Sequence, residues 1–579
     1  MKLSKMYIKN YRNFVDETIK LNKETVVIGP NDVGKTNLLM AIRLMLDKSL
    51  SYLDLEPQEK DFNIFTDFDE IIITLEFSDI NEETDSYIYA TLGHYIEDGN
   101  LYIMYKGYKD RDEKFEYFIS ARNEEVSFIK IPSRNTYINY INCVYLDSTR
   151  QLKQFLKKSK TNMIKSYKSN RTKDEISSDE NLIDIIGRQV SELNNNIENV
   201  SYINKSTSFI KEELQSMSSH NDNLEIKLSS YNDTDDIMDN VELISQIDGK
   251  NVNIGGDGRS NQIYMSMWIR EMNEKYDEKK QFVVFLLEEP ESHLHFPLQS
   301  MTIRQIIKKI NSQFIVTSHS PKIVMEFNPY SIVRLYFDKN KKTLIANEGC
   351  SQELEDCMVE FGYRYNLITG SMFYSSGVFL VEGTSELLLF KYILTQLGID
   401  IEKYNLMVIS VEGVGFKPYI KLLNKLSIPY AIRTDNDIYA ASNGKYYCYG
   451  INRLIDCFNE VNTLENQLSK DDFSELESNE LSESQKELFD NTLTRLNNSG
   501  LFLSNKDLEN DLAATDFIND YIIEKYGSTD KFVSKLQANK ANNMYHLIDE
   551  LKNKNLNIAD NSIGTFQDPI KWLINKVSE

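Results

Sequence analysis

Short apolar runs alternate with amphipathic stretches along most of the chain, which is the pattern of an α/β protein. The runs predict strands at residues 6–8, 26–28, 71–77, 282–287, 314–316, 378–381, 406–409 and 430–432. A helix with Leu38, Ile42 and Met45 on one face follows the second run. The later runs each end in polar or acidic residues, as in doubly wound sheets, whose ligands bind at the carboxyl ends of the strands.

The pattern changes between residues 151 and 242, where glycine and proline almost vanish. Apolar residues there follow helical spacing, as in Ile186, Val190, Leu193 and Ile197, and predict a helical insertion. Their alternating spacing of four and three fits either a helix–helix seam between subunits or a plain amphipathic helix of a separate domain. Residues 459–490 are acidic and helical in composition, and predict a second, solvated insertion.

Composition limits the class of protein. The chain has 579 residues, of which 41% are hydrophobic and 26% charged, so it has room for several globular domains. Its net charge of -23 disfavours coating of polyanions through the average field. No apolar run is long enough to span a bilayer and no apolar signal region opens the chain, so we expect a cytoplasmic protein without a membrane partner. The five cysteines form no CxxC pair, and neither a disulfide framework nor a thiolate zinc site is predicted.

Residues 29–36 (GPNDVGKT) match the phosphate-loop pattern GxxxxGK[ST] between a predicted strand and a predicted helix. The backbone N–H groups of such a loop bind phosphates, so Lys35 should reach the β and γ groups and Thr36 should ligate magnesium. The alternative is a chance glycine-rich turn, which the flanking strand and helix disfavour. The candidate ATP-binding residues of this segment are Asn31, Gly34, Lys35, Thr36 and Asn37.

Acidic residues follow the strand at 282–287 directly. We expect Glu288 to hold magnesium and Glu289 to polarise the attacking water, although a buried strand that ends in a charged turn is also common. His319 follows the strand at 314–316, where an imidazole could contact a γ-phosphate, but a lone histidine is more often structural. The glycines Gly256 and Gly258 precede an amphipathic helix and are either a nucleotide-contacting loop or a flexible turn.

A second group of acids follows the strands near the C-terminal third. Glu382 ends the strand at 378–381, Glu386 lies four residues further on, and Asp435 and Asp437 follow the strand at 430–432. Repulsion among these carboxylates would be costly without cations, and hard oxygen ligands suit Mg²⁺ or Mn²⁺. An Asp-x-Asp turn alone is ordinary on protein surfaces, so the prediction depends on Glu382 and the phosphate loop occurring with it.

The order of these motifs resembles the ABC-type ATPase head of chromosome-maintenance and recombination proteins, and especially the overcoming-lysogenization-defect (OLD) family. The residues that carry the resemblance are Asn10–Phe14, the loop 29–36 with Asn37, Gly256–Gly258, the box 288–291 and the run 317–320. The resemblance implies ATP held between two heads of a dimer or tetramer, with the loop at Gly256 and Gly258 facing the phosphates of the other head.

The C-terminal third resembles the toprim domain of topoisomerases, primases and OLD nucleases, through Glu382, Asp435 and Asp437. Residues 507–512 and Lys540 resemble further elements of the OLD nuclease site. This implies two ions of Mg²⁺ or Mn²⁺. The metal ligands of the toprim site would be Glu382, Asp435 and Asp437, with Glu386, Glu509 and Asp511 as a second group. Lys540 would stabilise the negative charge of the transition state.

Within the OLD family the chain resembles the nuclease subunit of the Gabija anti-phage defence system. That similarity implies a double-stranded DNA endonuclease restrained by bound nucleotide, in a complex with a superfamily 1 UvrD-like helicase. The alternative is an ATP-switched DNA clamp or scaffold whose toprim domain does not cleave. The expected domains are an ATPase lobe (1–150), a helical insertion that could serve dimerisation (151–242), a second ATPase lobe (243–345), a linker (346–375), and a toprim domain (376–579) with a helical insertion near 459–500.

Overall fold

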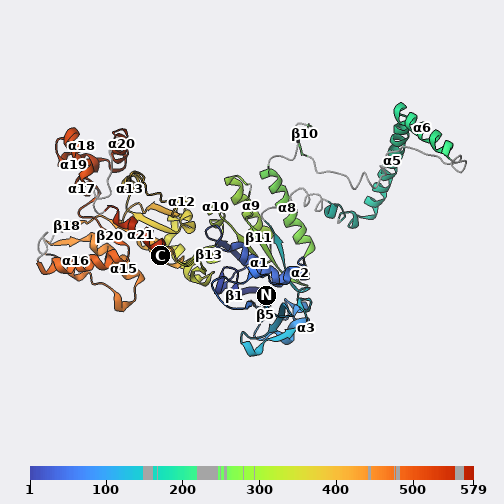
Figure 1. Cartoon of the computed structure of the whole chain (residues 1–579), viewed down its shortest axis with the longest axis horizontal. Helices are drawn as coiled ribbons and strands as arrows, with labels where there is room; N and C mark the ends of the chain where they lie inside the picture. The colour runs from blue at the N-terminus through green and yellow to red at the C-terminus, as the bar shows by residue number, and fades with distance from the viewer. Residues whose placement is uncertain are drawn as a thin grey trace. The chain divides into compact units, whose positions relative to one another are not determined.

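The computed structural model describes residues 1–147, 161–165, 167–217, 245–247, 250–252, 257–277, 279–292, 294–440, 445–474, 476, 483–554 and 566–578 (Figure 1). The chain divides into two compact units. One comprises Met1–Ser148, Tyr276–Ser292 and Phe296–Glu579, and the other Thr149–Lys275 with His293–His295. The first unit contains both an ATPase fold and a toprim fold, and so it carries both groups of predicted site residues apart from Gly256 and Gly258.

The N-terminal lobe begins with a six-stranded antiparallel sheet in the order β2-β1-β4-β5-β6-β7. Burial alternates along most of β1, so that one face of this strand packs on the core, whereas the middle of β4 is buried on both faces. The predicted strands at 6–8 and 71–77 lie within this sheet. The bounds are β1 (Lys2–Tyr11), β2 (Phe14–Lys20), β4 (Glu70–Ser78), β5 (Leu101–Tyr108), β6 (Phe115–Ser120) and β7 (Ile129–Ile131).

A second six-stranded sheet, in the order β14-β13-β3-β12-β11-β8, carries the phosphate loop. All its pairings are parallel except β13 with β14, as expected for a doubly wound sheet. The helix α1 (Lys35–Leu46) buries Leu38, Ile42 and Met45, and these side chains share one core with the first sheet. The strands are β3 (Glu24–Ile28), β8 (Ile141–Leu146), β11 (Phe282–Glu288), β12 (Phe314–Thr317), β13 (Ile332–Phe337) and β14 (Thr343–Ile345).

Further helices complete this lobe and lead to the next domain. They are α2 (Tyr52–Leu55), α3 (Ser86–Leu92), α9 (Phe296–Lys309), α10 (Pro321–Val324), α11 (Gln352–Phe361) and α12 (Leu367–Ser371). The last two lie in the segment 346–375, which the sequence analysis expects as a linker. Ser351 caps α11 and Asn366 caps α12, so this connection has secondary structure of its own.

The toprim domain is built on a four-stranded parallel sheet in the order β16-β15-β17-β20. The chain passes from β15 to β16 on one side through α13 and then crosses through α14 to β17 on the other side. The carboxyl ends of β15 and β17 therefore form a switch point, where doubly wound sheets bind ligands. The bounds are β15 (Gly377–Val381), α13 (Thr384–Gln396), β16 (Leu406–Ser410), α14 (Lys417–Lys425), β17 (Tyr430–Thr434) and β20 (Leu501–Leu503).

Helices from the C-terminal segment close the toprim core. α20 packs against α13, and α21 packs against β15 and β17, around a cluster that includes Phe379, Phe390 and Leu547. The elements are β18 (Ile438–Ala440), β19 (Tyr446–Cys448), α15 (Tyr449–Val461), α16 (Glu483–Asn498), α17 (Leu508–Ala513), α18 (Asp516–Tyr526), α19 (Thr529–Ala538), α20 (Lys540–Asn553) and α21 (Asp568–Ser578).

The second unit contains the predicted helical insertion. Its described elements are α5 (Lys173–Glu198), α6 (Ser201–Met217), β9 (Ser245–Ile247), β10 (Lys250–Val252) and α8 (Asp257–Lys275). Thr172 and Glu175 form a capping box at the start of α5, and Val190 is the buried residue of that helix. Leu193, on the same predicted seam, is exposed, so a seam between subunits stays a prediction.

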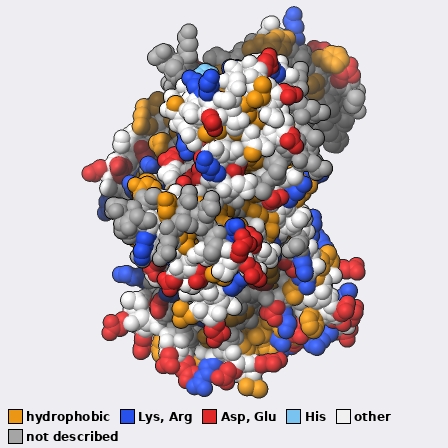
Figure 2. Space-filling model, turned by 90° about the vertical axis from the view of Figure 1, so that its left-hand side faces the viewer, with side chains coloured by type: hydrophobic (Ala, Val, Ile, Leu, Met, Phe, Trp, Pro, Cys, Tyr) orange, Lys and Arg blue, Asp and Glu red, His pale blue; other side chains and the backbone are white. Residues whose placement is uncertain are grey.

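The face of the protein in Figure 2 has no single sign of charge. On the face in Figure 2, acidic and basic side chains are interspersed, and hydrophobic side chains lie among them in small groups. No described helix is both long and apolar enough to cross a bilayer. The described part of this face therefore offers no broad charged surface for a ligand, and we expect ligand contacts in local groups of side chains.

Candidate nucleotide and metal sites

The phosphate loop owes its shape to glycine. Gly34 has a φ of 103°, and a Cβ atom placed there would lie 2.0 Å from the side-chain nitrogen of Asn13. The Asn13 amide instead donates to the Val33 carbonyl at 2.8 Å and accepts from Asn37 at 2.7 Å. The loop is therefore held from outside by a side chain of the N-terminal segment that resembles the OLD pattern.

Lys35 is buried at the base of this loop, with 6% of its surface exposed. Its ammonium group donates to the carbonyls of Gly29 and Pro30 at 2.9 and 2.7 Å. Burial lowers the pKa of Lys35 to about 8, although the carboxylate of Glu289 opposes this shift. A desolvated ammonium group that faces an open cleft gains most from an anionic ligand, as the phosphate prediction requires.

Thr36 and Glu288 meet at the end of β11. The Thr36 hydroxyl donates to Glu288 Oε1, and the Tyr145 hydroxyl from β8 donates to Glu288 Oε2. The predicted magnesium ligands of the ATPase are thus adjacent, 252 residues apart in sequence. The contact of Tyr145 with Glu288 could not be predicted from the sequence, because only the folded sheet shows that β8, which carries Tyr145, lies beside β11.

Glu289 and His319 face each other across the same edge. His319 Nε2 lies 3.0 Å from Glu289 Oε1, and Glu289 has a φ of 44°, a strained backbone conformation for a residue with a side chain. Burial lowers the pKa of His319, as does Lys35, which favours the neutral imidazole. Behind them, Glu291 accepts from the Ser318 hydroxyl at 2.6 Å and from the His319 backbone at 2.8 Å.

These side chains line one cleft of about 730 Å³. Its lining includes Asn31, Gly34, Lys35, Thr36, Asn37, Glu289 and His319. All the predicted ATP ligands of the first unit are therefore brought together, with Glu288 directly behind Thr36. Gly256 lies outside the described residues, and Gly258 lies in α8 of the other unit, so their contact with nucleotide stays a prediction.

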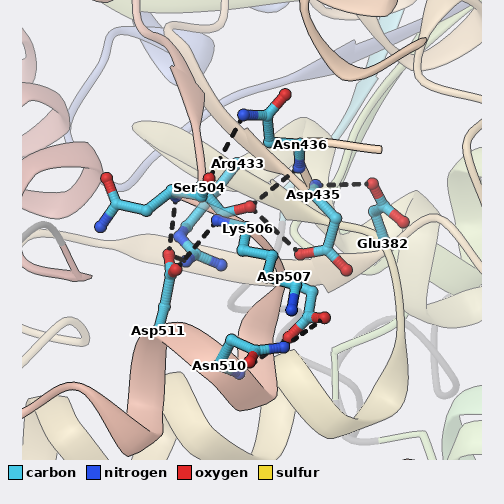
Figure 3. A network of polar contacts seen from close by, with 10 residues as sticks. Glu382, Arg433, Asp435, Asn436, Ser504, Lys506, Asp507, Asn510 and Asp511 are labelled. Atoms are coloured by element: carbon cyan, nitrogen blue, oxygen red, sulfur yellow. Dashed lines mark hydrogen bonds and ion pairs between the residues drawn. The ribbon is translucent and has the colours of Figure 1, made fainter. Parts of the chain in front are cut away.

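The toprim acids gather at the carboxyl edge of the second parallel sheet. Glu382 follows β15, and its Oε1 accepts from the Thr434 hydroxyl and, at 3.0 Å, from the backbone N–H of Asp435 after β17. Figure 3 shows Glu382, Asp435 and Ser504 side by side, with Ser504 donating to Asp435 at 3.5 Å. Three parallel strands therefore contribute one polar group each to this edge.

The acids at this edge affect one another electrostatically. Burial raises the pKa of Asp435 to about 7, and the charge of Glu382 adds to the shift. Burial likewise raises the pKa of Glu386 to about 8, with contributions from Asp435 and Glu382. Both shifts are caused mainly by burial and in part by repulsion between carboxylates, and a bound cation would relieve that repulsion.

Arg453 was missed by sequence reasoning. From α15 it bonds Glu382 Oε1 at 2.5 Å and Asp437 Oδ2 at 2.8 Å, and it also contacts the Thr434 hydroxyl. A guanidinium group thus bridges two predicted metal ligands. Its position follows the β18–β19 hairpin, and only the tertiary fold returns it to the sheet edge.

Glu509 and Lys540 supply the remaining predicted groups. Both carboxylate oxygens of Glu509 are buried without a hydrogen-bond partner among the described atoms, as is Glu386 Oε1. Burial raises the pKa of Glu509, and Lys540 opposes this. Burial would lower the pKa of Lys540, but Glu509, Asp435 and Glu386 outweigh it and the pKa is raised. Lys540 therefore lies within the field of all three acids.

Asp511 is turned to a different partner. It pairs with the buried Arg433 at 2.7 Å and accepts from the backbone N–H groups of Asn505 and Lys506 at 3.0 and 3.1 Å (Figure 3). Between 1 and 578, as far as the chain is described, no three acidic, histidine or cysteine side chains form a group that could hold a metal ion. The hard, partly unpartnered carboxylates nevertheless fit the chemistry of Mg²⁺ or Mn²⁺.

Comparison with known proteins adds the family. A model described as "AAA ATPase domain" matches residues 1–324, and one described as "Overcoming lysogenization defect protein-like, TOPRIM domain" matches residues 373–437. Endonuclease GajA of Bacillus cereus (strain VD045) is 26% identical over 96% of this chain and 96% of its own length. The OLD nuclease of Thermus scotoductus (strain ATCC 700910 / SA-01) is 22% identical over 76% of this chain and 82% of its own.

Among solved structures, the C-terminal region of the Xanthomonas campestris pv. campestris OLD protein, phased with mercury, has a TM-score of 0.23 and 21% identity. The match covers 36% of this chain and 98% of the solved chain. The predicted order of an ATPase followed by a toprim domain, and the resemblance to the OLD family, are confirmed by the two family models and the full-length relatives. Because the first family model matches more than half of this chain, the chain belongs to the AAA ATPase domain family. An OLD-like TOPRIM domain follows the ATPase domain in the sequence.

Proposed function

We propose that the chain is a nucleotide-regulated, divalent-metal-dependent DNA endonuclease of an anti-phage defence system. The observation that carries the proposal is the meeting of Glu382 and Asp435 at the ends of two neighbouring parallel strands, where Glu382 accepts from the Asp435 backbone N–H at 3.0 Å. Glu386 lies within the field of both acids, and Lys540 lies within the field of Asp435 and Glu386. Similarity over nearly the whole chain to a protein named Endonuclease GajA supports the nuclease activity. The defence role is what the resemblance to the Gabija nuclease subunit implies.

The metal site would take two ions of Mg²⁺ or Mn²⁺. Glu382, Asp435 and Asp437 would be the first group of ligands. Glu386, Glu509 and Asp511 would be the second group, for which Asp511 would have to leave Arg433. Bound ions of this kind position water and neutralise the leaving oxygen in phosphodiester cleavage. Lys540 would donate to the scissile phosphate, where negative charge develops. Arg453 would have to release Glu382 and Asp437 for these carboxylates to ligate metal.

The ATPase cleft would bind ATP, and the bound ATP would restrain cleavage of DNA by the toprim domain. Lys35 would bind the β and γ phosphates, Thr36 and Glu288 would hold magnesium, and Glu289 would orient water with His319 beside it. Asn31 and Asn37 would complete the cleft. Gly256 and Gly258 would contact the nucleotide of another copy, in a homodimer or homotetramer. A superfamily 1 UvrD-like helicase subunit is the proposed protein partner, and double-stranded DNA the substrate.

The proposal is tested by nicking of supercoiled plasmid with Mg²⁺ or Mn²⁺ across a titration of ATP. We expect Glu382→Ala to lower the nicking rate by about a hundredfold or more, because it removes a ligand that Asp435 and Arg453 also contact. Glu483→Ala is the matched control, since that side chain is 92% exposed on α16. Equal nicking by wild type and Glu382→Ala would refute the assignment of the site.

A second function has one observation in its favour. Arg453 and Arg433 already neutralise Glu382, Asp437 and Asp511, which would suit an ATP-switched DNA clamp or scaffold whose toprim domain does not cleave. Intact ATP hydrolysis and DNA binding by the wild type, with no cleavage of plasmid or oligonucleotide under any metal, would favour this function over the nuclease.

A further inference from the structure

Three tyrosine rings cluster where the hairpin of β18 and β19 meets the start of α15. β18 and β19 pair antiparallel, which places Tyr439 opposite Tyr447. The Tyr447 ring stacks on that of Tyr449 at 6.0 Å, and the Tyr439 ring meets Tyr449 edge-on at 6.4 Å. The contacts make the three rings one surface, called here the tyrosine cluster.

The tyrosine cluster is not part of the domain core. Tyr439 is 64% exposed and Tyr449 is 49% exposed, and neighbouring Ile438 is 46% exposed. Single exposed aromatic side chains are ordinary, but a mutually packed group presents a larger apolar surface to solvent than folding requires. Aromatic side chains in such groups are suited to bind a flat ligand, because few rotatable bonds have to be fixed.

Backbone contacts place the tyrosine cluster beside the acids. The Tyr449 N–H donates to the Asp437 carbonyl at 2.8 Å. At the next position, a Cβ atom on Gly450 would lie 2.3 Å from the Asp435 carbonyl, so α15 begins directly against the turn that carries both aspartates. Arg453 lies one helical turn beyond Tyr449, on the same face, and bonds Glu382 and Asp437.

We propose that the tyrosine cluster stacks an unpaired base of the DNA strand held at the toprim edge, next to the phosphodiester that is cut. In a duplex both faces of each base are covered by its neighbours, so only a base in single-stranded, bubbled or flapped DNA offers a face to Tyr439 or Tyr449. Stacking is independent of sequence and of charge. It therefore supplies affinity that a chain with a net charge of -23 cannot gain from its average field.

This proposal rests on the nuclease function and deepens it, since it names DNA with unpaired bases beside the cut as the preferred substrate. The test measures binding of a short oligonucleotide that carries 2-aminopurine, as a single strand and as a duplex, with Ca²⁺ present and intact DNA verified on a gel. We expect Tyr439→Leu and Tyr449→Leu each to weaken single-strand binding about tenfold, with duplex binding changed less than about twofold. Both should also reduce the quenching of 2-aminopurine in the bound strand.

Controls separate stacking from folding. Tyr449→Phe keeps the ring and should bind like the wild type, while Tyr87→Leu removes a tyrosine that is 52% exposed on α3 of the ATPase lobe and should change nothing. Tyr439 lies on the exposed hairpin, so its variant tests the proposal even if Tyr449→Leu folds poorly. Unchanged single-strand affinity and quenching in Tyr439→Leu would overturn the tyrosine cluster as a base site. Absence of plasmid nicking by the wild type would instead overturn the nuclease function.

Discussion

The ATPase cleft and the toprim edge both follow parallel strands, yet they hold their charges differently. In the cleft, one loop of eight residues supplies most of the contacts, and the Lys35 ammonium rests on the loop's own carbonyls. At the toprim edge, the acids come from separate strands and helices, and two arginines that are not among the predicted site residues bond Glu382, Asp437 and Asp511. In the cleft, the loop itself provides the partners of its cationic group, whereas at the edge the predicted metal ligands are bonded to arginines that metal binding would have to displace.

The difference follows from the signs of the charges. A phosphate loop binds anions with backbone N–H groups, which carry no net charge and repel nothing in the empty site. A binding site for divalent cations brings carboxylates together. Without the cation, their repulsion must be relieved by protonation or by a neighbouring positive charge. Arg453 and the raised pKa of Asp435 show both kinds of relief. We therefore expect substitutions in the cleft to act through shape and those at the edge to act through charge.

The largest effect should come from a residue that ties the two regions together. Arg334, 2% exposed on β13, donates to the carbonyls of Phe373 and Ser375 before β15 and of Leu426 before β17 at 2.8 to 2.9 Å. Arg334→Met leaves these buried carbonyls unpaired, so the free energy of unfolding in urea should fall by about 3 kcal/mol. The exposed Arg304→Met is the control, and an equal, small loss in both variants would show that the two regions do not depend on Arg334.

A smaller effect is expected from the shape of the phosphate loop. Gly34→Ala adds a Cβ atom onto the Asn13 amide at a φ of 103°, at a cost of about 2 kcal/mol. Calorimetry should show ATP affinity reduced by at least about tenfold, because the loop must move to relieve the overlap. Gly398→Ala, at a φ of 67° with no atom within 4 Å, should leave ATP binding unchanged. If ATP binds equally to both variants, the cleft does not depend on this backbone conformation.

The same contrast explains what the sequence could predict. The phosphate loop is contiguous, so its strand, glycines and Lys35 could be assigned directly, and Glu382 and Asp435 follow from their places after buried strands. Arg453 could not be assigned, because a hairpin and a helix separate it from its partners and only the packing of Gly450 against Asp435 returns it to them. The pairing of Asp511 with Arg433 depends on the face of β17 that the Arg433 side chain takes and on where α17, which carries Asp511, packs, and short apolar runs do not determine either.

The smallest effect should be the most diagnostic for the toprim edge. Arg453→Gln removes the guanidinium group that neutralises Glu382 and Asp437, so without metal the free energy of unfolding should fall by about 1 kcal/mol, a modest value because Asp437 is half exposed. Adding Mn²⁺ should close the gap to the wild type, because the ion supplies the positive charge that the variant lacks. Arg122→Gln, which breaks an exposed pair with Glu97, should lose little stability and show no response to Mn²⁺. A gap that stays the same with and without Mn²⁺ would mean that Arg453 and the metal do not share these carboxylates.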